Sequence, residues 1–377
     1  MSFELPAPKS LLGRHRLLAP SAGVLVSPIC LGGMNFGDFW KDMMGVCDKE
    51  TTFNILEYFY QKGGNFIDTA NSYQGEESEQ WVGEWLEKTG RRDEFVVATK
   101  YTDPYKTYDT EKQQSHYGGN GTKSLTIAVD AALKKLRTHY IDILYVHYYD
   151  LTTSIPELMQ SLNRLVLAGK VLYLGISDTP AWIVVKANDY ARQHGLRQFS
   201  VYQGQWSAAN RDFEREIIPM ALEEGMALAP WGTLGNGLFK SSKVLKDGGR
   251  QVGDDPAIQG NEAQVAVVLE KVADRHNTLI TSVALAYVFH KAPYVFPIIG
   301  GRKIEHLEGN IGALGLKLTP QDIDEIDNAY EWKAGFPHSF LTGSKNTPKG
   351  PGDILWPNVR GTFDFVERPK PITPKSE

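Results

Sequence analysis

Eight short apolar runs recur along the chain, and each is followed by a segment with helical periodicity. The runs are SPICL near residue 29, NFIDT near 67, EFVVATK near 97, YIDILYVH near 144, VLYLGIS near 174, QFSVYQ near 201, GMALAPW near 228 and YVFPIIG near 298. Strands that are apolar throughout and alternate with amphipathic helices indicate a parallel sheet covered by helices. With eight such units, the sequence predicts an α/β fold of the (β/α)8 TIM-barrel type.

The helices between these runs have recognisable ends. Segments 122–137 and 155–168 repeat apolar residues at three- and four-residue spacing, so a helix is predicted over each. Many helices are followed by a residue with left-handed backbone conformation, a position that glycine suits. Gly169 is predicted to follow the helix over 155–168 in this way, and Gly195 to follow a helix that starts near Pro180.

An open, doubly wound sheet is the alternative arrangement of alternating strands and helices. That fold normally carries a G-x-G-x-x-G fingerprint after its first strand, and the corresponding stretch here, ICLGGMNFG, lacks it. We therefore expect one domain over residues 1–377, with the barrel at about 20–330 and a proline- and glycine-rich lid or tail at about 333–377. Two insertions, 102–121 and 233–261, follow strands and are expected on the catalytic rim.

The composition favours a small, near-neutral partner. A net charge of −5 over 377 residues, with 42% apolar residues, suggests neither disorder nor a nucleic-acid-binding surface. Cys30 and Cys47 are too few for a disulfide scaffold, and the first residues lack the apolar run of a signal peptide, so a cytoplasmic location is expected. No apolar run approaches the ~20 residues that cross a bilayer. We expect no membrane contact, and a monomer or homodimer.

Four chemically useful side chains lie at the ends of successive predicted strands. Asp68 ends the second strand with Tyr73 just beyond it, Lys100 ends the third and His147 follows the fourth. Each alone has a structural explanation, such as a helix cap, packing, a solvated charge or a buried hydrogen bond. Because the carboxyl ends of barrel strands converge on one face, we expect all four in a single pocket.

This combination suits the reduction of a carbonyl group. Asp68 and Lys100 would form a buried ion pair, and the ammonium would lower the pKa of Tyr73 from its usual value of ~10. Tyr73 could then protonate a carbonyl oxygen that His147 orients by donating a hydrogen bond. The four residues include no activated serine or cysteine, so the electron pair is expected from a nicotinamide hydride.

These four residues, set in FIDTANSY, VVATK and LYVH, resemble the catalytic tetrad of the aldo-keto reductase superfamily, whose members are (β/α)8 barrels. The resemblance extends over about residues 10–330. The stretches LYVHYYD, GISDTPAW and LAPWGTLGNG are similar to a branch of fungal aryl-alcohol dehydrogenases and norsolorinic acid reductases. The resemblance implies a reversible, NADPH-dependent reduction of a small-molecule carbonyl substrate, either an aryl aldehyde or an aromatic ketone.

The resemblance also implies a site for NADPH/NADP+ across the barrel mouth. Ser177, Asp178 and Gln203 would bind the nicotinamide carboxamide, with Asp178 where the family usually has asparagine. Trp231 would stack on the nicotinamide ring, and Arg302 would bind the 2′-phosphate through its guanidinium fork. The remaining implied contacts are Gly33, Met34, Asn35, Asp68, Gly232, Leu234, Gly237, Gly300, Gly301, His306 and Asn310.

Aromatic residues just past the strand ends suggest a pocket for a flat substrate. We expect the segment from Gly335 to Trp356, rich in glycine and proline, to fold over the mouth as a lid. The candidate pocket residues are Trp40, Tyr101, Tyr148 and Trp206.

Other functions remain open at this point. A non-catalytic, reductase-like regulatory subunit could retain NADPH, and the substrate could be a polyketide intermediate of secondary metabolism. A metal-dependent barrel hydrolase would leave Tyr73 and Lys100 unexplained, so no metal is expected. The ligands of such a hydrolase would come from His139, Asp142, His147 and Asp150.

Overall fold

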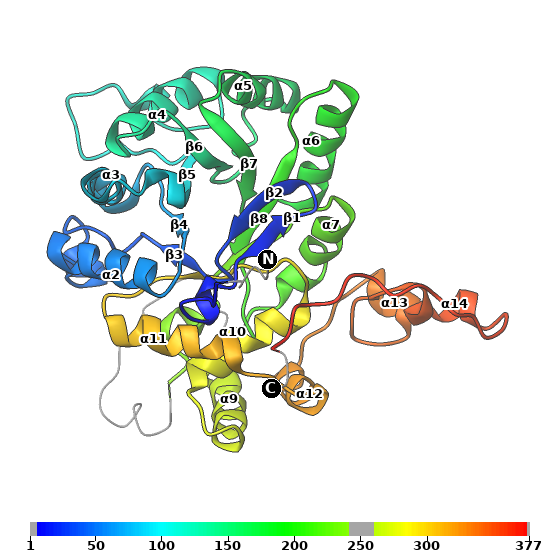
Figure 1. Cartoon of the computed structure of the whole chain (residues 1–377). Helices are drawn as coiled ribbons and strands as arrows, with labels where there is room; N and C mark the ends of the chain where they lie inside the picture. The colour runs from blue at the N-terminus through cyan, green and yellow to red at the C-terminus, as the bar shows by residue number, and fades with distance from the viewer. Residues whose placement is uncertain (1–5, 241–259, 375–377) are drawn as a thin grey trace, which may run out of the picture.

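A barrel of eight parallel strands forms the centre of the computed structural model, which describes residues 6–240 and 260–374 (Figure 1). The sheet order is β10-β3-β4-β5-β6-β7-β8-β9. All eight predicted runs are strands, so the (β/α)8 prediction is confirmed. The strands are β3 (Cys30–Gly32), β4 (Phe66–Asp68), β5 (Val96–Tyr101), β6 (Ile141–Val146), β7 (Val171–Ser177), β8 (Phe199–Gln205), β9 (Ala227–Trp231) and β10 (Ile298–Ile299).

β9, at the end of the sheet order, pairs with the chain that leads into β10, and this contact closes the barrel. Leu228 of β9 forms a parallel bridge with Val295. Its N–H donates to the Tyr294 carbonyl at 2.9 Å, and its carbonyl accepts from the Phe296 N–H at 2.8 Å. A sheet edge that is paired in this way excludes the open, doubly wound alternative.

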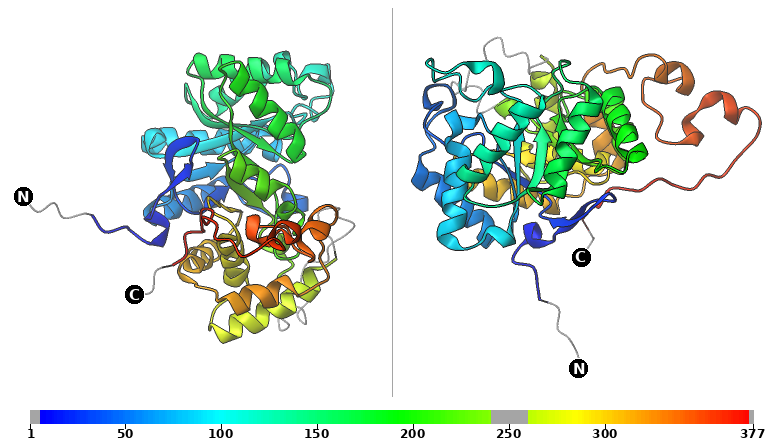
Figure 2. Two further views of the ribbon diagram at one scale, coloured as in Figure 1. Left: turned by 90° about the vertical axis from the view of Figure 1, so that its right-hand side faces the viewer. Right: turned by 90° about the horizontal axis from the view of Figure 1, so that it is seen from above.

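Helices surround the barrel on its outer side (Figures 1 and 2). Gly169 and Gly195 have φ values of +68° and +64°, as predicted for residues that follow a helix. Within the described part of the chain, we find no helix with the length and apolar character needed to span a membrane. The main helices are α2 (Lys49–Gln61), α3 (Glu77–Thr89), α4 (Thr122–Lys135), α5 (Ile155–Leu167), α6 (Ala181–Gln193), α7 (Ile217–Glu223), α9 (Glu262–Arg275), α10 (Ile280–Lys291), α11 (Ile304–Gly312) and α12 (Pro320–Asp327).

A short hairpin, outside the eight predicted runs, closes the amino-terminal end of the barrel. It consists of β1 (Arg16–Ala19) and β2 (Ala22–Val26), which pair antiparallel. Leu18 and Val26 are fully buried and belong to the same apolar cluster as the inward-facing residues of the barrel strands. The opposite end, where the strands have their carboxyl termini, is therefore the end that carries the rim loops.

The insertion at 102–121 is held against the barrel by polar contacts. Lys106 and Tyr108 both contact the carboxylate of Glu76, which lies in the short helix η2 (Tyr73–Glu76). Residues 241–259 of the other predicted insertion, 233–261, lie outside the described residues.

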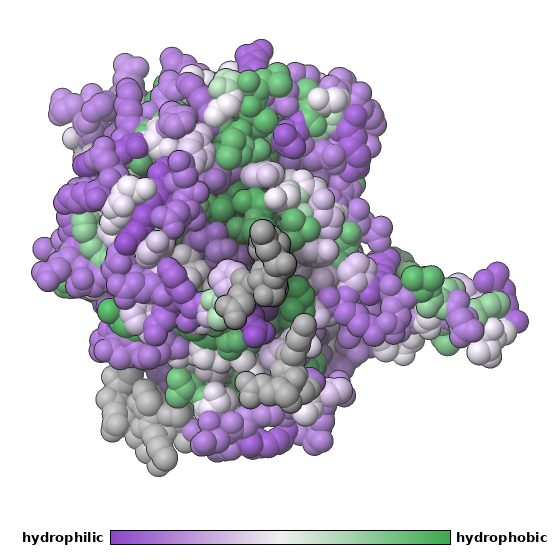
Figure 3. Space-filling model, viewed as in Figure 1, coloured by the Kyte–Doolittle hydropathy of each residue, from purple (hydrophilic) through white to green (hydrophobic). Residues whose placement is uncertain are grey.

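The C-terminal segment does not form the lid that its composition suggested. Its two short helices, α13 (His338–Thr342) and α14 (Leu355–Asn358), extend sideways from the barrel as an arm (Figures 1 and 2). Large apolar residues lie exposed on this segment, including Phe336 and Val366, and Figure 3 shows hydrophobic surface on the arm.

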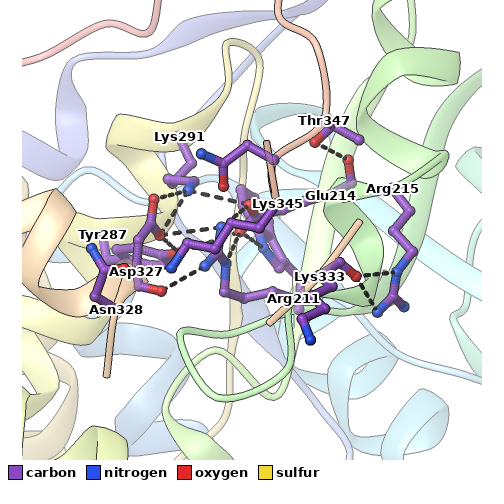
Figure 4. Close-up of polar contacts among 12 residues, drawn as sticks. Arg211, Glu214, Arg215, Tyr287, Lys291, Asp327, Asn328, Lys333, Lys345 and Thr347 are labelled. Atoms are coloured by element: carbon purple, nitrogen blue, oxygen red, sulfur yellow. Dashed lines mark hydrogen bonds and ion pairs between the residues drawn. The ribbon is translucent and has the colours of Figure 1, made fainter. Parts of the chain in front are cut away.

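Polar contacts explain why the segment lies beside the barrel. The Thr347 hydroxyl donates to the Glu214 carbonyl at 3.1 Å, and the guanidinium of Arg215 donates to the Lys333 carbonyl at 3.1 Å (Figure 4). Both partners on the barrel belong to the loop between β8 and α7. These anchors attach the segment to the rim loop that follows β8, and from there the arm extends sideways (Figure 2), so the prediction of a lid over the mouth is wrong for this structure.

Candidate active site

Strand register explains why polar side chains meet at one end of the barrel. Side chains alternate between the barrel interior and the helix layer with a period of two. Phe66, Ala98, Tyr145 and Val201 belong to the interior cluster. The next inward position along each strand is two residues further on, and these positions are Asp68, Lys100, His147 and Gln203.

An ion pair between Asp68 and Lys100 occupies this layer. Lys100 Nζ contacts Asp68 Oδ1, and the two side chains are 0% and 3% exposed. Lys100 Nζ also donates to the Thr69 carbonyl at 2.8 Å, and Gln203 Nε2 donates to Asp68 Oδ2 at 2.9 Å. Both charges thus have hydrogen-bond partners, as a buried ion pair requires.

The pKa values of the two charged groups depend on each other. Burial alone would lower the pKa of Lys100, but the interactions with Asp68 and with the Tyr73 hydroxyl outweigh it and raise that pKa. Burial raises the pKa of Asp68 against the opposing effects of Lys100 and Gln203. The raised pKa of Lys100 supports a charged pair, so the layer holds a fixed positive charge next to a fixed negative one.

Tyr73 lies within reach of this pair. Lys100 Nζ is 3.2 Å from the Tyr73 hydroxyl, and the ammonium lies 4.7 Å from the ring centroid. Burial nevertheless raises the pKa of Tyr73, because desolvation outweighs the effect of Lys100. The predicted lowering of this pKa is therefore wrong, and Tyr73 holds its proton at neutral pH.

His147 faces Tyr73 across the same pocket. The two rings meet edge to face, with centroids 6.0 Å apart. Burial, with the charge of Lys100, lowers the pKa of His147 to about 4, although Asp103 acts in the opposite direction. The imidazole is consequently neutral near pH 7. The structure thus brings all four predicted side chains to one end of the barrel.

Three of the residues predicted to bind the nicotinamide form a second cluster on the neighbouring strands. Ser177 ends β7 and donates through Oγ to Asp178 Oδ2 at 3.1 Å, while Trp231 Nε1 donates to Asp178 Oδ1 at 3.3 Å. Asp178 has φ of +40°, in the left-handed region. Desolvation raises its pKa to about 6, although part of its surface remains exposed at the mouth.

An open pocket of about 570 Å³ lies beside the start of α11. Arg302 and His306 are exposed there, and the positive end of the α11 helix dipole favours an anion. A Cβ at Gly45 would lie 1.5 Å from Arg302 Nη1, so the guanidinium packs against the chain before α2. The lining residues are Thr51, Asn54, Ile55, Arg302, Lys303, Ile304, Glu305 and His306.

Most of the other residues implied for cofactor binding lie in loops that follow the strands. Gly33 is buried between strands, with its N–H donating to the Asp68 carbonyl at 2.7 Å. A Cβ at Gly300 would lie 3.3 Å from Asn35 Nδ2, so the loops after β10 and β3 are in contact. Asn310 is buried in α11 and Met34 is exposed. Gly232, Leu234, Gly237 and Gly301 complete the set, each exposed or half-buried.

The four aromatic residues predicted for the substrate pocket divide into two pairs. Trp40 lies 6.5 Å from Tyr73 between ring centroids, and Tyr148 lies 6.2 Å from His147. Tyr101 and Trp206 are 1% and 0% exposed and belong to the core. The prediction that these two line the pocket conflicts with their burial. Tyr101 ends β5 and Trp206 directly follows β8, and both side chains lie in the packed layer between barrel and helices.

Some residues near the site have no role in the sequence-based prediction. Asp103 lies 3.3 Å from His147 Nδ1, and Phe39 and Tyr108 form an aromatic pair on the rim. Asp103 lies two residues after the end of β5, and a polar residue so near a strand end was the available signal. Phe39 and Tyr108 lie in loops, where the spacing of residues in the sequence does not predict which way a side chain points.

The arrangement differs from that of a metal site. Among the described residues, no group of three histidine, cysteine, aspartate or glutamate side chains could hold a metal ion. Asp142 begins β6 and pairs with Arg92 at 2.7 Å, whereas His147 follows the other end of that strand. Two of the conceivable ligands therefore lie at opposite ends of the barrel.

The buried ion pair generates a stability prediction. Lys100→Met or Asp68→Asn should each destabilise the protein by about 3 to 5 kcal/mol, because each leaves an unpaired partner in the barrel. The double variant should recover much of that loss. Urea-unfolding midpoints of the four proteins test this, with Lys333→Met in the exposed pair with Glu331 as a control that changes little. Additive losses in the double variant would contradict it.

Comparison with known proteins agrees with this geometry. The aldo/keto reductase family model matches residues 28–331. An aryl-alcohol dehydrogenase from Pestalotiopsis microspora is 58% identical, covering 99% of this chain and 97% of that protein. A norsolorinic acid reductase B from Dothistroma septosporum is 54% identical, covering 96% and 95%. An aryl-alcohol dehydrogenase [NADP(+)] from Phanerodontia chrysosporium is 49% identical, covering 88% and 90%. On these matches, the chain belongs to the aldo/keto reductase family.

Proposed function

We propose that this protein is an NADPH-dependent reductase of aryl aldehydes or aromatic ketones, and that it also oxidises the corresponding alcohols. The observation that carries the proposal is the Tyr73 hydroxyl, buried at the carboxyl end of the barrel 3.2 Å from the Lys100 ammonium. A phenol in that position is a proton donor with a cation beside the oxygen that loses the proton.

The residues present fit a bound NADPH. The pocket beside α11 offers Arg302 and a helix N-terminus to a phosphate, and the cluster around Asp178 offers polar groups beside the Trp231 ring. The NADP(+) in the printed name of one relative supports the same cofactor. When bound, NADPH supplies the hydride for the carbonyl carbon.

The side chains of the chain itself would handle the proton. Tyr73 donates its proton to the carbonyl oxygen as that oxygen gains negative charge, and Lys100 stabilises the phenolate that remains. Asp68 keeps the ammonium in place, since the two are paired at 0% and 3% exposure. His147, whose ring centroid lies 6.0 Å from that of Tyr73, would hydrogen-bond to the same oxygen. In the reverse reaction the Tyr73 phenolate accepts the alcohol proton.

The substrate class follows from the aromatic side chains around the tetrad. Trp40 and Tyr148 lie next to Tyr73 and His147, so a flat ring could pack beside the reacting carbonyl. Relatives named as aryl-alcohol dehydrogenases support this choice. Several relatives are named norsolorinic acid reductase, which supports an aromatic ketone, such as a polyketide intermediate, as the second candidate substrate.

A non-catalytic subunit that only retains NADPH is the contrasting possibility. All four tetrad positions are filled and in contact, which favours an enzyme. Both cysteines, Cys30 and Cys47, are free and buried, which is compatible with the proposed cytoplasmic location.

Removing the Tyr73 hydroxyl provides the main test. Tyr73→Phe should lower kcat for benzaldehyde reduction roughly 10²- to 10⁴-fold, the usual contribution of a general acid, and leave the Kd for NADPH nearly unchanged. Loss of NADPH absorbance measures the rate and protein fluorescence measures the Kd. Tyr140→Phe is the matched control, because Tyr140 precedes β6 at the other end of the barrel and its hydroxyl donates to Asp93. Wild-type turnover in Tyr73→Phe would show that Tyr73 is not the acid.

The ranking of substrates tests the pocket. We expect kcat/KM to fall from benzaldehyde to an unbranched aliphatic aldehyde of similar size and then to an aldose. Trp40→Ala should reduce the ratio of kcat/KM for benzaldehyde to kcat/KM for the aliphatic aldehyde roughly two- to tenfold. The reason is that a well-placed aromatic pair contributes ~0.5 to 1.5 kcal/mol. Steady-state rates with each aldehyde measure both effects. A preference for the aldose would contradict the proposed substrate class, although reductase activity would stand.

Arg302 should distinguish the two nicotinamide cofactors. Arg302→Ala should weaken NADPH binding roughly ten- to a hundredfold, because a charge-assisted hydrogen bond to the 2′-phosphate is lost. NADH lacks that phosphate, and its affinity should hardly change. Titration of both cofactors tests this, with Lys303→Ala as a comparator from the same pocket. Equal weakening of NADPH and NADH would indicate a structural role for Arg302.

A further inference from the structure

Gln74 connects the loop that carries Tyr73 to the loop that carries Trp40. Its side chain is fully buried and lies in η2, directly after Tyr73. Gln74 Oε1 accepts a hydrogen bond from the Trp40 N–H at 2.7 Å, and Gln74 Nε2 donates to the Met34 carbonyl at 3.0 Å. One amide group therefore binds the backbone at both ends of residues 34–40, in the loop after β3.

The backbone of Gln74 has a conformation that glutamine rarely adopts. Its φ of +53° and ψ of +42° lie in the left-handed region, which costs free energy for a residue with a Cβ atom. Glycine at this position would relieve the strain, but it would lose both side-chain hydrogen bonds. The contacts of the amide group thus offset a backbone conformation that is itself unfavourable.

The two loops pass close to each other around this side chain. A Cβ at Gly37 would lie 2.3 Å from Gln74 Cβ, and a Cβ at Gly75 would lie 2.9 Å from Phe39 Cγ. Both positions therefore require glycine, because any side chain there would push the loops apart. The sequence allows the loop after β3 to lie directly against η2, where the amide of Gln74 reaches its backbone.

A neighbouring carboxylate holds the middle of the same loop. Glu77 Oε2 accepts hydrogen bonds from the N–H groups of Asp38 at 2.7 Å and Phe39 at 3.0 Å. These bonds end one residue before Trp40, whereas the bond to Gln74 fixes the Trp40 N–H itself. The position of the Trp40 backbone therefore depends on Gln74 in a way that Glu77 does not replace.

We propose that Gln74 is a positioning residue, which holds Trp40 beside Tyr73 and thereby sets the preference of the site for aryl substrates. The proposal deepens the proposed function and rests on it for this consequence. The Trp40 ring is half-buried, with its centroid 6.5 Å from that of Tyr73. A ring that is held in place before binding contributes more to the affinity for a flat substrate, because no entropy is lost in ordering it. An aliphatic chain depends less on the orientation of that ring.

Substrate selectivity tests this proposal. Gln74→Met keeps a side chain of similar length and removes both hydrogen bonds. At saturating NADPH, it should reduce the ratio of kcat/KM for benzaldehyde to kcat/KM for the aliphatic aldehyde roughly two- to tenfold, the range expected for removal of the Trp40 ring. The change should arise mainly from a higher KM for benzaldehyde. Gln80→Met is the matched control, because it makes the same exchange at an exposed position of α3.

A double variant separates the positioning of Trp40 from a general structural role. In the Trp40→Ala background, Gln74→Met should leave the ratio nearly unchanged, since the ring that it positions is absent. Equal losses of kcat/KM for both aldehydes in Gln74→Met alone would overturn the proposal, and so would effects on the ratio that multiply in the double variant. If Gln74→Met does not fold, Gln74→Gly, which suits the left-handed backbone, replaces it with the same expected ratios.

Hydrogen exchange measures the hold on the loop without turnover. The Trp40 N–H should exchange roughly two- to tenfold faster in Gln74→Met than in the wild type, the effect of losing one neutral hydrogen bond. Amides of α5, on another side of the barrel, should exchange at unchanged rates. Unchanged exchange at Trp40 would overturn the proposal for Gln74 even if aldehyde reduction is intact. Absence of aldehyde reduction in the wild type, with faster exchange at Trp40 in Gln74→Met, would overturn the proposed function and leave the hold of Gln74 on Trp40 standing.

Discussion

The buried ion pair between Asp68 and Lys100 is the interaction on which the arrangement of this site depends. An isolated charge in the barrel would be very costly, so the two side chains fix each other's position. Lys100 in turn contacts the Tyr73 hydroxyl and the Thr69 carbonyl. The loop after β4, which carries Tyr73, is thereby tied to β5 through one ammonium group. The barrel supplies this geometry because its strand ends converge on a single layer.

The parts of the structure that depend on local periodicity could be predicted from the sequence. The eight strands were recognisable because their apolar runs are short and bounded by helical repeats. The convergence of Asp68, Lys100 and His147 followed from their places at the ends of those strands. Hairpin β1–β2 lacked this support, since its strands are outside the alternating pattern, and only tertiary packing of Leu18 and Val26 shows its role.

The parts that depend on a balance of opposing effects could not be predicted in this way. A neighbouring ammonium suggests a lower pKa for Tyr73, yet desolvation is larger and raises it; sequence spacing gives the neighbour but not the depth of burial. Trp206 lies just past a strand end, and it is nevertheless fully buried against Phe213. The arm after Gly335 is placed by contacts with residues more than a hundred positions away, such as Thr347 with Glu214.

Burial therefore sets the protonation states from which the proposed chemistry starts. It raises the pKa of Tyr73 and lowers that of His147, so both groups are neutral at pH 7 and the only fixed charges of the tetrad are Asp68 and Lys100. A phenol in this state is ready to give a proton, and the resulting phenolate would be left in a desolvated site. The attraction of Lys100, which is too weak to ionise Tyr73 beforehand, then offsets part of that cost. On this argument Lys100 acts after the proton has begun to move, because the negative charge that it stabilises exists only then.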